Sequence, residues 1–144
     1  MTYGIIFQSF VQVLIRLNFG VSCQLPTNER SSMRDVRPRT INFYQIPNGP
    51  EPFTEWFLSI RDTKTRQRIQ ARLTSVRVGN LGNYRFVGNG VWELRLDFGP
   101  GYRIYYGEVD NTVVLLLCGG DKSSQQRDIE RAKNYWEEYK ERHN

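Results

Sequence analysis

The strongest constraint on the fold comes from a run of strand patterns in the second half of the chain. Residues 92–98 alternate between apolar and polar side chains, which is typical of a strand with one buried face. A Gly-Pro-Gly turn at 99–101 leads to a second alternating segment at 102–106, and a turn at 110–111 leads to the apolar run 113–117. Short turns of this kind join antiparallel strands, so these residues predict a mostly antiparallel sheet.

Three further elements are expected before this sheet. Residues 40–46 are rich in β-branched and aromatic side chains and predict a strand. Apolar residues at helical spacing predict one helix over 53–60 and a second helix with apolar residues from 69 to 76. Asp62 or Thr63 is the expected N-cap of the second helix.

A last helix is expected at the C-terminus, with Ser123 as its N-cap and Gln126 as the third-position partner of a capping box. The order is then strand, two helices, about four strands and a helix. We therefore expect an α+β fold over residues 40–144, with two helices packed on a mostly antiparallel sheet of four to five strands and a C-terminal helix.

Residues 1–39 differ from the rest and are expected to be an N-terminal extension. Residues 3–19 are mostly apolar and predict a loose helix or little structure, and they are short and interrupted for a membrane span. No stable membrane association is therefore expected. The polar stretch that follows contains Met33, and our hypothesis is that Met33 is the natural start of the chain. An amphipathic anchor helix is the alternative.

The charge is concentrated in one segment. The chain of 144 residues has a net charge of +5, and residues 61–77 hold six basic residues against one acidic residue, Asp62. This pattern indicates a polyanionic or acidic partner on one face, and a solvated helix face is the alternative. The single histidine, His143, and two cysteines without a C-x-x-C spacing argue against histidine-dependent triads and zinc sites. We expect no metal or cofactor, and a reducing, cytoplasmic location.

The hairpins predict which side chains meet. If the first hairpin closes on residues 99–101, Asp97 faces Arg103 and Arg95 faces Tyr105. The second hairpin would bring Cys118 beside Arg103. Glu93 and both arginines would then share one polar face of the sheet.

Five residues on or beside this face suggest phosphate chemistry. Arg95, Arg103 and Lys122 are candidate catalytic cations, because guanidinium groups bind phosphate oxygens and a metal-free ribonuclease must stabilise a pentacoordinate phosphate. Tyr102 and Tyr105 are candidate RNA-stacking residues. This interpretation requires two arginines that project together, without carboxylate partners, into an open pocket. A cross-strand ion-pair ladder with Glu93 and Asp97 is the alternative.

The chain from about residue 40 to 142 resembles the RelE/ParE superfamily of bacterial type II toxins, and most closely its addiction-module killer proteins, which are related to HigB. The most specific match is Leu-Leu-Leu-Cys-Gly-Gly-Asp-Lys-Ser-Ser-Gln at 115–125. Further matches lie at 53–56, 65–73, 79–82, 90–95 and 99–106. The resemblance does not extend to residues 1–32.

The resemblance implies a toxin that a small helix-turn-helix antitoxin neutralises, and that cuts messenger RNA in the ribosomal A site. It assigns Arg95 and Arg103 to the scissile phosphate and the transition state, and Lys122 to phosphate binding or proton transfer. It implies that the basic second helix lies along ribosomal RNA. The helix residues concerned are Lys64, Arg66, Arg68, Arg72 and Arg77.

Two alternatives stay open within the same resemblance. ParE-like members are thought to poison DNA gyrase without cutting RNA, and a decayed toxin would only bind its antitoxin. The general base of a nuclease also has no clear candidate, because no histidine matches the C-terminal catalytic position of the family and His143 lies beyond the expected helix.

Overall fold

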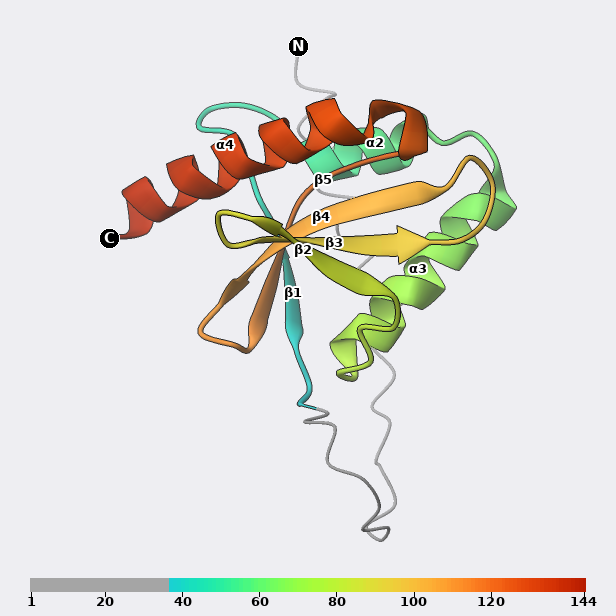
Figure 1. Ribbon diagram of the computed structural model, residues 1–144, viewed down its shortest axis with the longest axis horizontal. Coiled ribbons are helices and arrows are strands. Elements are labelled where there is room, and N and C mark those ends of the chain that lie inside the picture. The colour runs from blue at the N-terminus through green and yellow to red at the C-terminus, as the bar shows by residue number, and fades with distance from the viewer. Residues whose placement is uncertain (1–36) are drawn as a thin grey trace, which may run out of the picture. The chain divides into compact units, whose positions relative to one another are not determined.

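The computed structural model describes residues 37–144, which form one five-stranded sheet with helices on both of its faces (Figure 1). The predictions for residues 1–36, including the apolar helix and the start at Met33, lie outside this range. In chain order the elements are β1 (Thr40–Phe43), α2 (Pro52–Ser59), α3 (Thr63–Arg77), β2 (Tyr84–Gly88), β3 (Val91–Leu96), β4 (Tyr102–Val109), β5 (Val113–Gly120), the 3-10 turn η1 (Lys122–Ser124) and α4 (Gln125–His143).

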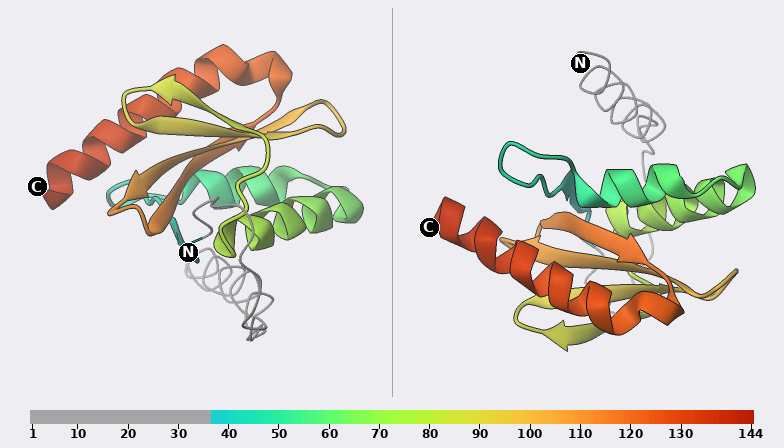
Figure 2. Two further views of the ribbon diagram at one scale, coloured as in Figure 1. Left: turned by 60° about the horizontal axis from the view of Figure 1, so that its bottom comes forward. Right: turned by 90° about the horizontal axis from the view of Figure 1, so that it is seen from above.

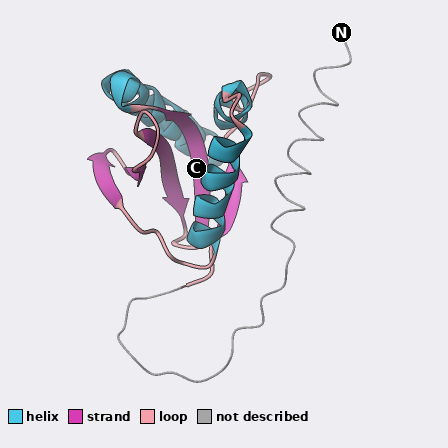
Figure 3. Ribbon diagram, turned by 90° about the vertical axis from the view of Figure 1, so that its right-hand side faces the viewer, coloured by secondary structure: helices cyan, strands magenta, loops and turns pink. Residues whose placement is uncertain are grey.

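The sheet order is β1-β5-β4-β3-β2, and β1 runs parallel to β5 while the other neighbours are antiparallel. Helices α2 and α3 lie on one side of the strands and α4 lies on the other (Figures 2 and 3). On the α4 side, Ile129, Ala132 and Trp136 are buried with Tyr105 and Leu117. Burial on both faces explains why β5 is apolar along its whole length.

The α+β class, the mostly antiparallel sheet and the C-terminal helix are confirmed. The details of the helices differ from the prediction. The structure has η1 before α4, and the capping box is formed by Asp121 and Ser124 rather than by Ser123 and Gln126. Asp121 reaches the N–H groups of Ser123 and Ser124 at 2.8 and 3.3 Å, so the chain turns two residues earlier than expected. Asp62 is the N-cap of α3, which confirms one of the two residues predicted for this position.

The predicted hairpin registers are wrong. Arg103 lies opposite Arg95 rather than Asp97, and opposite Gly120 rather than Cys118. The first error arises because the β3–β4 connection is longer than the three glycine and proline residues that mark it. The second arises from a longer turn after β4 and from an irregularity in the β4–β5 pairing, where Tyr105 pairs with Cys118 and Tyr106 with Leu116, which leaves Leu117 of β5 without a partner in the register.

The helices between residues 37 and 144 lack the combination of length and apolar character that a bilayer crossing requires. Cys118 is buried, and burial raises the pKa of its thiol to about 12, so it is not a reactive nucleophile.

Candidate functional site: an arginine cluster on the sheet

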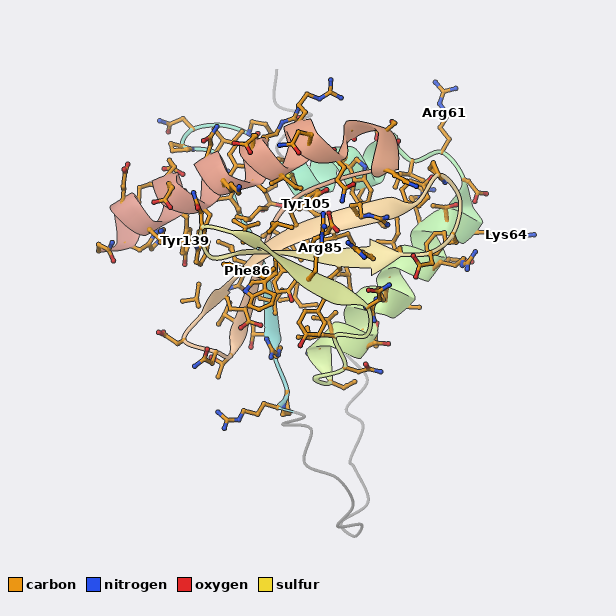
Figure 4. All side chains as sticks on the ribbon, viewed as in Figure 1. Arg61, Lys64, Arg85, Phe86, Tyr105 and Tyr139 are labelled. Carbon is orange, nitrogen blue, oxygen red and sulfur yellow. The ribbon has the colours of Figure 1, made fainter. Side chains whose placement is uncertain are left out.

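Glu93 lies at the centre of a group of arginines on the α4 side of the sheet. Arg85 of β2 and Tyr105 of β4 are its direct neighbours on the two flanking strands. Arg95 lies two residues further along β3, on the same face, and Arg103 lies opposite Arg95. We call Arg85, Arg95, Arg103 and Glu93 the arginine cluster. Figure 4 shows Arg85 and Tyr105 near one another over the strands.

The three arginines approach the same carboxylate oxygen. The Nε atoms of Arg85 and Arg95 each lie 3.0 Å from Glu93 Oε1, and the Nε atom of Arg103 lies 3.9 Å from it. The Glu93 side chain has 0% exposure, whereas those of Arg85, Arg95 and Arg103 are 45%, 32% and 11% exposed. A buried carboxylate of this kind is stable only because it is paired and hydrogen-bonded.

The second carboxylate oxygen is also satisfied. Gln125 Nε2 at the start of α4 donates to Glu93 Oε2 at 2.7 Å, and the Tyr105 hydroxyl donates to it at 3.2 Å. Burial alone would raise the pKa of Glu93, but the hydrogen bonds from Gln125 and Arg95 and the charge of Arg85 outweigh it and lower that pKa. Glu93 is therefore an anion at neutral pH. Burial and this anion raise the pKa of Tyr105, which stays a neutral donor.

The arginine cluster carries an excess of positive charge, because three guanidinium groups surround one carboxylate. Glu93 contacts the arginines through their Nε atoms. Arg103 also donates from Nη1 to the Tyr102 carbonyl at 3.1 Å, but the terminal nitrogens of Arg85 and Arg95 make no hydrogen bond to residues 37–144. Terminal guanidinium nitrogens of this kind suit an oxyanion such as phosphate.

The interpretation requires Arg95 and Arg103 to project together, without carboxylate partners, into an open pocket, and this condition is not met, because both pair with the Glu93 carboxylate and Arg103 is only 11% exposed. They share one face, but Glu93 lies between them. The ion-pair ladder forms only in part, because Asp97 accepts a hydrogen bond from Asn83 Nδ2 at 3.2 Å instead. Lys122 is exposed at the start of η1, and the structure describes no contact between it and the arginine cluster.

The two candidate stacking residues differ in accessibility. Tyr105 is completely buried, so its ring has no surface on which a base could stack, and the prediction for it is wrong. Tyr102 is half-buried, with its ring 6.1 Å from that of Trp56 and 5.6 Å from that of Phe98. Tyr102 therefore keeps some accessible ring surface.

The basic residues of α3 have different roles. Arg72 is half-buried and donates to the carbonyls of Leu81 and Asn83, and desolvation lowers its pKa. It therefore fixes the loop before β2. The guanidinium carbon of Arg68 lies 3.9 Å from the centre of the Phe98 ring, a cation–π contact. Lys64 and Arg77 are exposed and Arg66 is half-buried, and Lys64 extends away from the fold (Figure 4).

An open groove runs between α3 and the end of β3. It has a volume of about 490 Å³ and is lined by Arg68, Ala71, Arg72, Ser75, Asn83, Arg95, Leu96, Asp97 and Phe98. Arg95 is the one member of the arginine cluster among these lining residues. The lining contains three arginines and one aspartate, which favours an anionic ligand.

The sequence did not point to Arg85, to Gln125 or to the central position of Glu93. Arg85 could have been found by continuing the hairpin through the Gly88-Asn89-Gly90 turn, which sets β2 against β3. Gln125 comes from an element distant in sequence, and only the packing of α4 brings it to Glu93.

A comparison with family models gave no match to this chain. A protein of Haemophilus influenzae (strain ATCC 51907 / DSM 11121 / KW20 / Rd), described only as an uncharacterized protein, is 41% identical to it over 81 residues. The aligned part is 56% of this chain and 82% of the Haemophilus protein. Identity of this level over most of the relative shows common descent, and the chain belongs to the same family as that uncharacterized Haemophilus influenzae protein.

Proposed function

We propose that this chain is the toxin of a type II toxin–antitoxin pair and acts as a ribosome-dependent messenger RNA endoribonuclease of the RelE/ParE kind. The observation that carries the proposal is the arginine cluster, in which the terminal nitrogens of Arg85 and Arg95 make no hydrogen bond within residues 37–144 and lie beside an excess of positive charge. The sequence motifs that resemble those toxins, including 90–95 and 99–106, contribute Arg95 and Arg103 to this cluster.

The proposed reaction uses the ribose as nucleophile. The 2′-oxygen attacks the adjacent phosphorus, its proton passes to a base, and the bond from phosphorus to the 5′-oxygen breaks as that oxygen gains a proton. The products are a 2′,3′-cyclic phosphate and a 5′-hydroxyl. Arg95 and Arg103 stabilise the extra negative charge of the pentacoordinate phosphate, and Lys122 binds phosphate or donates the proton to the leaving oxygen.

Glu93 acts as a positioning residue in this scheme. It has no exposed surface and its pKa is lowered, so it is a poor group for removing the proton of the 2′-hydroxyl. It holds the Nε sides of Arg85 and Arg95, which leaves their outer nitrogens for the phosphate. His143 lies at the end of α4, with Nδ1 2.7 Å from the carbonyl of Tyr139, and has no part in the scheme.

Because the cluster itself supplies cations rather than a base, we propose that the ribosome completes the site, and that cleavage of naked RNA is weak. The exposed basic residues of α3 and the groove that contains Arg68 and Phe98 would contact the RNA backbone outside the scissile phosphate. A small helix-turn-helix antitoxin encoded beside the toxin is the proposed neutralising partner.

The test is induced expression in bacteria without antitoxin, followed by primer extension on messenger RNA. We expect growth arrest and new 5′ ends within codons, both lost in Arg95→Ala and kept in Arg142→Ala. Arg142 is a matched control because it is 39% exposed and paired with Glu138 near the end of α4. DNA damage without new RNA ends would identify a gyrase poison, and absence of growth arrest would leave only antitoxin binding. Either result would overturn the nuclease proposal.

A further inference from the structure

Strand β2 ends the sheet with two exposed aromatic side chains. Tyr84 and Phe86 are 45% and 55% exposed, and β3 is the neighbour on which β2 pairs. Their ring centres lie 5.7 and 5.0 Å from that of Trp92, so the three rings form one aromatic surface. Phe86 is labelled on this strand in Figure 4, and Figure 2 shows β2 at the margin of the sheet.

The backbone of the same two residues points outward. The N–H of Arg95 donates to the Asn83 carbonyl at 2.9 Å, which makes these residues a hydrogen-bonded pair of the antiparallel ladder. Such pairs alternate, so Arg85 is directed toward β3, and the N–H and C=O groups of Tyr84 and Phe86 are directed away from it. Between residues 37 and 144 no backbone group bonds to this edge.

The opposite face of β2 is basic. Arg85 lies between Tyr84 and Phe86 in sequence and projects to the face of the arginine cluster. A groove of about 310 Å³ separates β2 from α4 on this side, and it is lined by Arg85, Phe86, Val87, Gln126, Ile129, Glu130 and Lys133. Glu130 lies 3.8 Å from Lys133, so Arg85 adds a positive charge to a groove that is otherwise balanced.

We propose that the outer edge of β2 binds an extended segment of a partner protein as an added strand, with apolar and acidic residues in alternation. Apolar side chains of the segment would cover Tyr84 and Phe86 on one face, and an acidic side chain would lie opposite Arg85 on the other. An uncovered edge strand with exposed aromatic residues is otherwise a site for unwanted association. This inference does not depend on the proposed nuclease activity.

Charge argues against a second copy of this chain as the occupant. Two copies of β2 paired antiparallel, with Tyr84 opposite Phe86, would place Arg85 opposite Arg85 of the other copy. Like charges directly opposite one another destabilise a strand pair, and the nearby Arg95 and Arg103 add to the repulsion. An acidic segment would instead be attracted to Arg85 and to the nearby Arg95 and Arg103.

The first test uses three fluorescein-labelled peptides and fluorescence anisotropy with the full chain. The probe is Thr-Val-Glu-Val-Glu-Val-Glu-Val-Thr, the charge control replaces each Glu with Lys, and the backbone control has Pro at the central position. We expect saturable binding of the Glu peptide, weakened by salt, and at least tenfold weaker binding of both controls. Absence of saturable binding by the Glu peptide, or equal binding of the Lys peptide, would overturn the proposal.

The second test changes the edge of β2. In Phe86→Pro the outward N–H and the ring are lost while the β2–β3 ladder is kept, whereas Phe86→Val loses only the ring. We expect affinity for the Glu peptide to fall in Phe86→Val, and to fall about fivefold further in Phe86→Pro because one backbone hydrogen bond is missing. Equal affinities of the two variants would contradict strand addition.

Two measurements keep the proposal testable if Phe86→Pro does not fold. In the unaltered protein, saturation with the Glu peptide should slow hydrogen exchange at the amides of Tyr84 and Phe86, and unchanged exchange would overturn the proposal.

Sedimentation equilibrium without peptide should give a monomer. A dimer that Phe86→Val weakens would identify a second copy as the occupant, and a nine-nucleotide RNA that displaces the peptide from this edge would identify RNA instead.

Discussion

Arg95 and Arg103 are direct cross-strand partners on β3 and β4, so two guanidinium groups lie side by side on one face of the sheet. Like charges in this position destabilise a sheet unless an anion compensates them. Glu93, two residues before Arg95, is that anion, and it also compensates Arg85 on the next strand. The stability of the domain and the geometry of the candidate site therefore depend on the same carboxylate.

The first prediction concerns the removal of this charge. We expect Glu93→Gln to lower the free energy of unfolding by about 2 kcal/mol, less than for a fully buried ion pair because the arginines keep partial access to water. Urea unfolding followed by circular dichroism measures the change. Glu130→Gln is the matched control, since Glu130 is 60% exposed and pairs with Lys133 at 3.8 Å, and it should change stability by less than about 0.5 kcal/mol. Equal effects of the two substitutions would contradict the central role of Glu93.

A pH dependence follows from the lowered pKa of Glu93. A carboxyl whose pKa is lower in the folded state than its ordinary value of 4.5 contributes stability above that value. This contribution is lost as the pH falls from about 4.5 through the folded-state pKa, because the unfolded chain then binds the proton more readily. Asp62 and Asp121 also have lowered pKa values, so the informative quantity is the difference between the unaltered protein and Glu93→Gln. This difference in the free energy of unfolding should become smaller as the pH falls from 6 to 3. A difference that does not change with pH would contradict a contribution from the lowered pKa of Glu93.

The arginines should differ in how their loss affects activity and folding. Arg95 is 32% exposed and Arg103 is 11% exposed, so Arg95→Ala should remove activity with a small effect on stability, whereas Arg103→Ala should also destabilise the fold. For a group that stabilises the transition state, we expect a loss of about 10²–10³-fold in cleavage rate. Primer extension on ribosome-bound messenger RNA measures cleavage, and thermal unfolding measures stability. Full cleavage by Arg95→Ala would remove Arg95 from the proposed mechanism.

A packing prediction concerns Gly119 at the end of β5. A Cβ atom added at this position would lie 2.2 Å from a ring carbon of Trp56, so Gly119→Ala forces the indole to move. We expect a loss of about 1–3 kcal/mol in the free energy of unfolding. The double variant Gly119→Ala, Trp56→Leu should be more stable than the sum of the single effects predicts, because the smaller side chain makes room. Additive effects in chemical denaturation would show that the two sites do not interact.

The face that carries the candidate site could be predicted from period-two alternation, because Glu93, Arg95 and Arg103 occupy odd positions on strands with clear patterns. The pairing of these residues across the strands could not be predicted, since the register depends on turn length and on strand irregularities that have weak sequence signals. The length of the β3–β4 connection decides that Arg103 faces Arg95 rather than Asp97.

Contacts between elements that are distant along the chain also could not be predicted from the sequence. Arg72 has the appearance of a residue for RNA binding on a basic helix, yet it bonds to the carbonyls of Leu81 and Asn83. Tyr105 alternates as an exposed strand residue would, but α4 covers this part of the sheet and buries its ring. In both cases the packing of elements that are distant along the chain decides the environment of the side chain.

The parallel pairing of β1 with β5 joins the first and last strands of the domain. A chain leaving the ribosome makes β1 before the other strands of this sheet, but the strand that must lie beside it is synthesised about seventy residues later. Nascent chains that stop before Val113 therefore lack a partner for β1 and a neighbour for β4. Completion of the sheet, and with it any activity that depends on the folded sheet, is therefore delayed until Val113–Gly120 has been synthesised.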